Sequence, residues 1–140
     1  MLKTIDTIQI GDFAVFSKTI SESDVYLYAG ISGDFNPAHV NAVEAEKGMF
    51  GERIAHGMLT ASFISTVLGT HLPGPGTIYL GQELSFKRPV KFGDTIEAKV
   101  EVIERIVEKN RLILRTTCTN QHGEIVIDGK ATVMPPKATG

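Results

Sequence analysis

Two short stretches of the sequence contain groups that could carry chemistry. In the first, Asp34 and His39 lie five residues apart, across a segment that Pro37 shapes into a loop. A carboxylate and an imidazole held in this way could act on one water molecule, moving protons to and from it. The alternative is structural, because Asp34 could simply cap the turn while His39 forms a local hydrogen bond.

The second stretch is His56-Gly57-Met58, at the start of an expected helix. The first amide groups of a helix lack intrahelical partners and carry the positive end of its dipole. A negatively charged oxygen can therefore be stabilised at Gly57. Gly57 could instead serve only to permit a tight entry to the helix. Two turns further on, Ser65 either borders the same region or bonds back to its own helix.

Basic residues are concentrated just after a later strand, at Lys87, Arg88 and Lys91. They form either a solvated rim or a contact for the phosphates of a substrate that is attached to a cofactor. The histidines do not have the spacing of metal ligands, and His71 and His122 are isolated. No metal site is therefore expected.

The helix that would carry Gly57 and Ser65 spans residues 56–69. It has no Asp, Glu, Lys or Arg on any face, which predicts a buried helix rather than a surface one. At 1.5 Å per residue it would be roughly 20 Å long, the width of a small domain. Small residues at every fourth position would let another backbone or a ligand approach closely. They are Gly57, Ala61, Ser65 and Gly69.

Other elements flank this helix. We expect a short strand over 12–19, a helix from Ser21 to about Gly30, and a short helix over 43–47. From residue 77 onward the period changes to that of strands, with turn signals at hairpin spacing. The four later strands are expected at 78–86, 96–102, 112–118 and 125–133. An antiparallel sheet wrapped around the single uncharged helix is the natural packing for this order of elements.

Length and composition limit what the protein can be. The 140 residues have room for one domain, which we expect to span the whole chain, 1–140. With 14 Lys and Arg against 16 Asp and Glu, the net charge of −2 argues against nucleic acid and anionic membranes as partners. No stretch is apolar enough to span a membrane. The single thiol, Cys118, forms no internal disulfide, which together with the lack of a signal sequence favours the cytoplasm.

Four segments together resemble one enzyme family. They are residues 33–39 (GDFNPAH), 53–59 (RIAHGML), 79–82 (YLGQ) and 86–90 (FKRPV). These segments closely resemble the (R)-specific enoyl-CoA hydratases, in the MaoC-like dehydratase branch of the hot-dog fold, over roughly residues 10–135. The resemblance implies an α+β hot-dog fold, in which an antiparallel sheet of five to six strands wraps around one long central helix.

The same resemblance implies that water is added to trans-2-enoyl-CoA, giving (R)-3-hydroxyacyl-CoA. Asp34 and His39 would hold and activate the water, and the Gly57 amide would bind the thioester oxygen as charge builds on it. Asn36 would orient the loop or the substrate, and Phe35 and Met58 would wall the pocket. The remaining expected substrate contacts are Ser65 near the acyl pocket and Lys87, Arg88 and Lys91 at the phosphates. No metal or separate cofactor is implied, because coenzyme A is part of the substrate.

The resemblance further implies a homodimer with a sheet continuous across the interface and, without selecting a pathway, a role in fatty acid or polyhydroxyalkanoate metabolism. Three other functions stay open, because the fold alone does not decide between them. The chain could be a hot-dog acyl-CoA thioesterase, a dehydratase of 3-hydroxyacyl groups on acyl carrier protein, or a non-catalytic acyl-CoA binding module. The pairing of Asp34 with His39 favours the hydratase.

Overall fold

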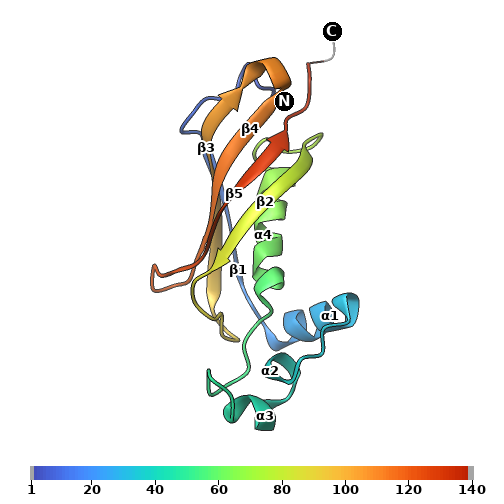
Figure 1. Cartoon of the computed structure of the whole chain (residues 1–140), viewed down its shortest axis with the longest axis vertical. Coiled ribbons are helices and arrows are strands. Elements are labelled where there is room, and N and C mark those ends of the chain that lie inside the picture. Colours follow the sequence, from blue (N-terminus) through green and yellow to red (C-terminus); the bar gives the residue numbers. More distant parts are fainter. Residues whose placement is uncertain (1, 139–140) are drawn as a thin grey trace.

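A computed structural model describes residues 2–138, in which a five-stranded antiparallel sheet curves around one long helix (Figure 1). The strand order is β1-β3-β4-β5-β2, so β1 and β2 form the two edges. The strands are β1 (Phe13–Thr19), β2 (Ile78–Phe86), β3 (Thr95–Ile106), β4 (Arg111–Thr119) and β5 (Ile125–Met134). The helices are α1 (Glu22–Ser32), α2 (Pro37–Val40), α3 (Ala42–Glu46), α4 (Gly57–Thr70) and the 3₁₀ turn η1 (Val107–Lys109).

The alternating side chains of β3 show how the sheet covers the helix. Its fully buried positions are Ile96, Ala98, Val100 and Val102. The residues between them are half-buried or exposed. β4 pairs with β3 in antiparallel register, which places Cys118 opposite Ala98 on the same buried face. The half-buried antiparallel strand expected from the sequence is therefore confirmed.

The long helix α4 is buried on one face only. Its residues buried against the sheet are Leu59, Thr60, Ala61, Phe63, Ile64, Val67 and Leu68. Met58, Ser62, Ser65 and Gly69 lie on the exposed face. The expectation of burial on every face is wrong for this single chain, because one five-stranded sheet covers only one side of the helix. Neither α4 nor any other helix within residues 2–138 is long and apolar enough to cross a membrane.

The helix α1 begins with a reciprocal cap. The Ser21 hydroxyl accepts from the Asp24 amide, and the Asp24 carboxylate accepts from the Ser21 amide. Lys18 donates to the same carboxylate at 2.6 Å, and this bond is the largest of the causes that lower the pKa of Asp24. At the other end, Gly33 has a φ of 80°, a left-handed conformation that glycine adopts without strain. The chain therefore turns out of α1 directly before Asp34.

Residues 33–56 form an overhanging segment beyond one end of the sheet, beside the start of α4 (Figure 1). The sequence predicts a loop around Pro37, but α2 begins there, because the first position of a helix does not need the N–H that proline lacks. Asn36 caps this helix, since its side-chain oxygen accepts from the Ala38 amide at 3.0 Å. His39 is thereby placed on a helical turn rather than on a loop.

Candidate active site

A cavity of about 590 Å³ lies between the overhanging segment, the start of α4 and the segment at the end of β2. The overhanging segment contributes Asp34 and His39, and the start of α4 contributes Gly57 and Met58. Residues 86–90, at the end of β2 and just after it, also line the cavity. The two stretches selected by residue chemistry thus meet in one place.

Asp34 and His39 are both held by the backbone. The Asp34 carboxylate accepts from the Asn36 amide at 3.1 Å, so Asp34 also caps the turn, as the structural alternative required. His39 Nδ1 lies 2.7 Å from the carbonyl oxygen of Ile54. A carbonyl can only accept, so Nδ1 donates, and the neutral ring keeps its lone pair on Nε2. That nitrogen can take a proton from a ligand.

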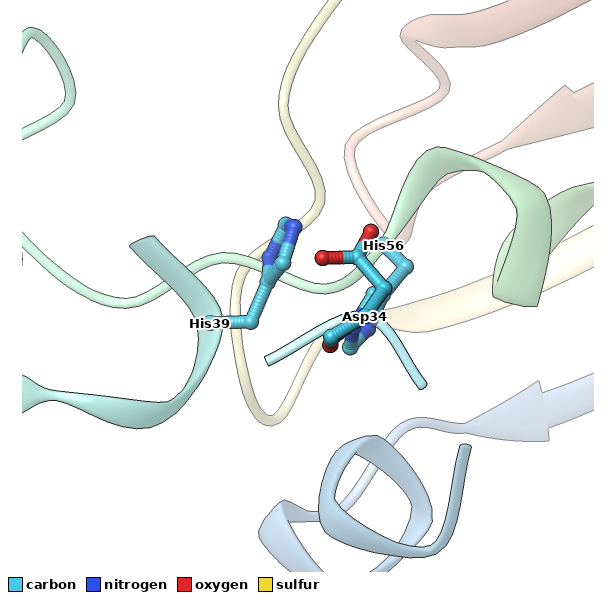
Figure 2. A group of neighbouring side chains, drawn as sticks. All are labelled: Asp34, His39 and His56. Atoms are coloured by element: carbon cyan, nitrogen blue, oxygen red, sulfur yellow. Dashed lines mark hydrogen bonds between the residues drawn. The ribbon is translucent and has the colours of Figure 1, made fainter. Parts of the chain in front are cut away.

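His56 forms a cluster of three side chains with Asp34 and His39 (Figure 2). One carboxylate oxygen and one nitrogen of each ring all lie within 4.8 Å of one another. The His56 ring is buried, and its centroid is 3.8 Å from that of His39 in a stacked arrangement. Sequence reasoning missed His56 as a site residue. The available signal was a histidine directly before an otherwise uncharged helix.

The spacing of Asp34 and His39 suits one shared water molecule. Within residues 2–138, no hydrogen bond or ion pair joins the Asp34 carboxylate to either ring. A water that bonds two groups at about 2.8 Å each spans a gap of up to about 5.6 Å, and a carboxylate oxygen of Asp34 and one ring nitrogen of His39 lie within 4.8 Å of each other. A carboxylate and an imidazole lone pair around one water can perform general base and general acid steps in turn.

The same three side chains are less suited to a metal ion. An imidazole binds a metal through a nitrogen lone pair, which lies in the plane of the ring. The His39 and His56 rings are stacked with 27° between their planes, so an ion close to both nitrogens would lie outside at least one plane. One nitrogen of each ring is also engaged by a backbone carbonyl. Metal binding would require the two rings to separate.

Gly57 is the first residue of α4 and lines the cavity. As the first helical residue, Gly57 has no intrahelical partner for its amide, and within residues 2–138 this amide donates no backbone hydrogen bond. A Cβ atom at position 57 would lie 2.7 Å from Phe86 Cε1. A larger residue at position 57 would therefore force the Phe86 ring or the helix start to move.

Nearly the whole chain resembles known proteins. Residues 9–123 match the family model described as a MaoC like domain. This chain belongs to the MaoC-like family. It is 55% identical to an (R)-specific enoyl-CoA hydratase of Rhodospirillum rubrum, over 97% of this chain and 94% of that protein. It matches the unliganded R-hydratase PhaJ1 of Pseudomonas aeruginosa with a TM-score of 0.92 and 46% identity, over 97% of this chain and 87% of that one.

A further relative of this MaoC-like chain carries a different name. It is a mitochondrial 3-hydroxyacyl-[acyl-carrier-protein] dehydratase of Arabidopsis thaliana, 36% identical over 92% of this chain and 78% of that protein. The likeness to the R-hydratase structure confirms the α+β hot-dog fold that the sequence resemblance implied. The sheet has five strands, within the expected range of five to six.

The cavity of this MaoC-like chain gathers most of the expected site residues. It brings together Asp34, His39, Gly57, Met58, Lys87 and Arg88. Phe35 is 61% exposed and lies outside the lining, and Asn36 is the cap of α2. Ser65 lies on the exposed face of α4, and Lys91 pairs with Glu52 at 3.4 Å. The catalytic and substrate-binding roles of all these residues, inside and outside the lining, stay predictions.

Proposed function

We propose that this protein is an (R)-specific enoyl-CoA hydratase, which adds water reversibly to trans-2-enoyl-CoA and forms (R)-3-hydroxyacyl-CoA. The observation that carries the proposal is the pair of Asp34 and His39, spaced for one water in a cavity that also contains a helix start. The 55% identity to a Rhodospirillum rubrum protein of that name supports the same activity.

In the proposed mechanism, one water lies between Asp34 and His39. As its oxygen forms a bond to C3 of the enoyl group, an O–H bond breaks and the proton passes to His39 Nε2. The pair then returns a proton to C2 on the same face of the double bond, so the addition is syn. Groups that are positioned for such proton transfers contribute on the order of 10²–10⁴-fold in rate.

The Gly57 amide is proposed to bind the thioester oxygen. Negative charge builds on that oxygen as water attacks, and the amide lies at the positive end of the α4 dipole. Loss of one such donor in other enzymes costs about 3–4 kcal/mol of transition-state stabilisation. An amide at a helix start needs no reorganisation at the moment of reaction, because the helix already holds it.

Coenzyme A is proposed to bind at the rim of the cavity, where Lys87 and Arg88 are exposed. Their positive charges suit phosphate groups. Arg88 pairs with Glu124 at 3.3 Å, but an exposed pair of this kind is weak enough to exchange for a phosphate. Binding energy from this remote part of the substrate can be used at the reacting carbons. Coenzyme A is part of the substrate, and the proposed reaction uses no further cofactor.

A second candidate function is the dehydration of 3-hydroxyacyl groups on acyl carrier protein. The Arabidopsis thaliana relative of that name favours it. The reaction is the reverse of hydration on a different carrier, so the same chemistry of Asp34 and His39 would serve both. The ratio of kcat/KM for coenzyme A and carrier-protein thioesters of one acyl group separates the two candidates.

A homodimer in the cytoplasm is proposed as the working form. The edge strand β2 exposes Ile78 and Leu80, and the exposed face of α4 includes Ser62 and Ser65. A second copy of the chain, joined edge to edge at β2, would extend the sheet and could cover that face. The cytoplasmic location is supported by the unpaired thiol of Cys118, which needs no oxidising compartment.

The deciding experiment is incubation with crotonyl-CoA, the four-carbon trans-2-enoyl thioester. The expected result is loss of the enoyl absorbance without release of free thiol, and (R)-3-hydroxybutyryl-CoA as the main product by chiral analysis. Release of free thiol would identify a thioesterase instead. The (S) product would contradict the proposed activity, and tight binding without turnover would identify a binding module.

A further inference from the structure

His56 is a buried histidine in the cavity to which the proposed reaction gives no task. The residue is 3% exposed, and it contacts both residues of the proposed proton-transfer pair. We propose that His56 is a positioning residue. It holds the Asp34 carboxylate and the His39 ring at fixed positions relative to the first amide of α4. This inference rests on the proposed function, since it assigns the arrangement of that same site.

The first contact joins His56 to the backbone of Asp34. His56 Nε2 lies 2.9 Å from the Asp34 carbonyl oxygen, across 22 residues of chain. Because a carbonyl only accepts, Nε2 carries the hydrogen in this bond. Asp34 otherwise lies in an exposed turn that follows the left-handed Gly33. The bond therefore ties this turn to the residue that begins α4.

The second contact joins His56 to the ring of His39. The two ring centroids are 3.8 Å apart with 27° between the planes. The hydrogen bond from His39 Nδ1 to the Ile54 carbonyl holds one edge of the ring. The main motion still open to the ring is rotation about this hydrogen bond. Stacking on His56 restricts this rotation and so sets the direction in which His39 Nε2 points.

The position of His56 in the chain supports a role beyond helix capping. His56 is the N-cap of α4, and its carbonyl accepts from the amides of Leu59 and Thr60. Ser, Thr, Asp and Asn are preferred at this position because their side chains bond to the first amides. The His56 side chain makes no such bond and reaches across to Asp34 instead.

The second ring nitrogen strengthens the inference. His56 Nδ1 is buried and has no hydrogen-bond partner within the described part of the chain. Buried polar groups are nearly always paired, because an unpaired one lowers stability. An apolar side chain would avoid that loss. A histidine is therefore unfavourable here for folding alone, whereas the donor Nε2 and the flat ring both serve the Asp34–His39 pair.

Two amide variants test the proposal, because their amide groups replace different ring nitrogens. In His56→Gln the amide nitrogen comes near the place of Nε2 and can still donate to the Asp34 carbonyl. In His56→Asn it reaches only the place of Nδ1, and the bond is lost. With crotonyl-CoA, we expect kcat to fall about tenfold for His56→Gln, which keeps the bond but loses the stacked ring, and roughly 100-fold or more for His56→Asn, which loses both, since a misplacement of about 1 Å has effects of that size. KM should change little in both.

A matched pair of control variants is His122→Gln and His122→Asn. His122 lies exposed in the turn before β5, outside the cavity lining, and neither change should alter kcat. If His56→Asn does not fold, His56→Phe takes its place, because it keeps the ring over His39 and loses the bond. Its kcat should then lie well below that of His56→Gln, with every rate expressed per folded molecule.

A measurement independent of turnover completes the test. The Asn36 amide donates to the Asp34 carboxylate, so its hydrogen exchange reports whether the turn is held. Exchange should be faster in His56→Asn and near the parent rate in His56→Gln. Equal kcat in the two variants, a loss seen in KM instead of kcat, or unchanged exchange in both would overturn the positioning role. A parent protein that does not hydrate crotonyl-CoA would contradict the proposed function, and amide exchange alone would then decide the role of His56.

Discussion

The ring of Phe86 occupies the space in which a side chain on Gly57 would begin. A Cβ atom at that position would lie 2.7 Å from Phe86 Cε1 and 2.8 Å from Cδ1, closer than carbon atoms normally approach. The contact joins the end of β2 to the first turn of α4. It therefore links one wall of the cavity to the amide that is proposed to bind the thioester oxygen.

Replacement of Gly57 by alanine tests this contact. We expect Gly57→Ala to lower kcat for crotonyl-CoA about tenfold or more, because either the ring or the helix start must move, with strain of about 1–3 kcal/mol. In a Phe86→Leu background the same change should have a smaller effect, since leucine removes the ring atoms that would collide. Melting curves and kcat of the two single variants and the double variant provide the comparison. Gly30→Ala, in α1, is the control, because nothing lies within 4 Å of its added Cβ.

The proton-transfer pair should behave as one unit. Asp34→Asn keeps an oxygen for the Asn36 amide but removes the base, and His39→Asn keeps a donor near Nδ1 for the Ile54 carbonyl but cannot carry a proton. Each change alone should lower kcat by roughly 10²–10⁴-fold. The double variant should lose little more than either single variant, because groups that act on one water are not additive.

A purely structural role of this pair predicts the opposite pattern. Loss of a turn cap would lower the free energy of unfolding by about 1 kcal/mol, while kcat per folded molecule stayed near that of the parent. Melting curves measured beside kcat distinguish the two outcomes. A normal kcat in Asp34→Asn would end the proposed mechanism.

Periodicity was enough to predict most of the elements. One buried face imposes a period of two on residues 96–102, and this pattern located the core of β3. The absence of charge located α4 but did not reveal that one of its faces is exposed. The covered fraction of the helix surface depends on the width of the sheet and on whether a second copy of the chain packs against it. Local sequence encodes neither of these.

The candidate site was predictable where residue types carry chemistry, as with Asp34 and His39. His56 was missed because its importance lies in a contact with a carbonyl 22 residues away, which spacing does not reveal. The helix α2 was missed because Pro37 favours both a turn and the first position of a helix. Such features depend on how distant segments meet.

The proposed homodimer predicts a mass of twice the 15.2 kDa chain by light scattering at micromolar concentration. Leu80→Glu should shift the protein toward monomer, because Leu80 is 45% exposed on the edge strand β2 and a charge there opposes edge-to-edge pairing. Val107→Glu is the matched control, since Val107 is 49% exposed in η1, away from that edge. A fully active parent monomer would contradict the proposed assembly.

Ser65 provides a test of where the acyl chain runs. It lies on the exposed face of α4, so an acyl chain would reach it only along the helix surface that a second copy is proposed to cover. Ser65→Phe should then lower kcat/KM for a six-carbon enoyl-CoA more than for crotonyl-CoA, by about tenfold in the ratio. Thr70→Phe, at the far end of α4, should leave the ratio unchanged. Equal losses on both substrates would remove Ser65 from the acyl pocket.

The single thiol should be unreactive in the folded protein. Burial raises the pKa of Cys118 from its ordinary value of 9.0 to about 12, so roughly one molecule in 10⁴ carries the reactive thiolate at pH 8. A thiol reagent should react with one thiol per chain in denaturant and at least about 100-fold more slowly without it. Because the folded state favours the protonated thiol, its contribution to stability is lost as the pH rises from 9 toward 12. Rapid labelling of the native protein would contradict the burial of Cys118.

The reactive groups of the cavity come from one stretch of the chain, whereas its walls come from several. Asp34, His39, His56 and Gly57 all come from residues 34–57, whereas residues 86–90 and Ile127 come from the ends of β2 and β5. Evolution can therefore alter the second part, and with it the carrier or the acyl group accepted, while the first part is inherited unchanged. In this way coenzyme A hydratases and carrier-protein dehydratases could diverge from one ancestor while keeping the same catalytic mechanism.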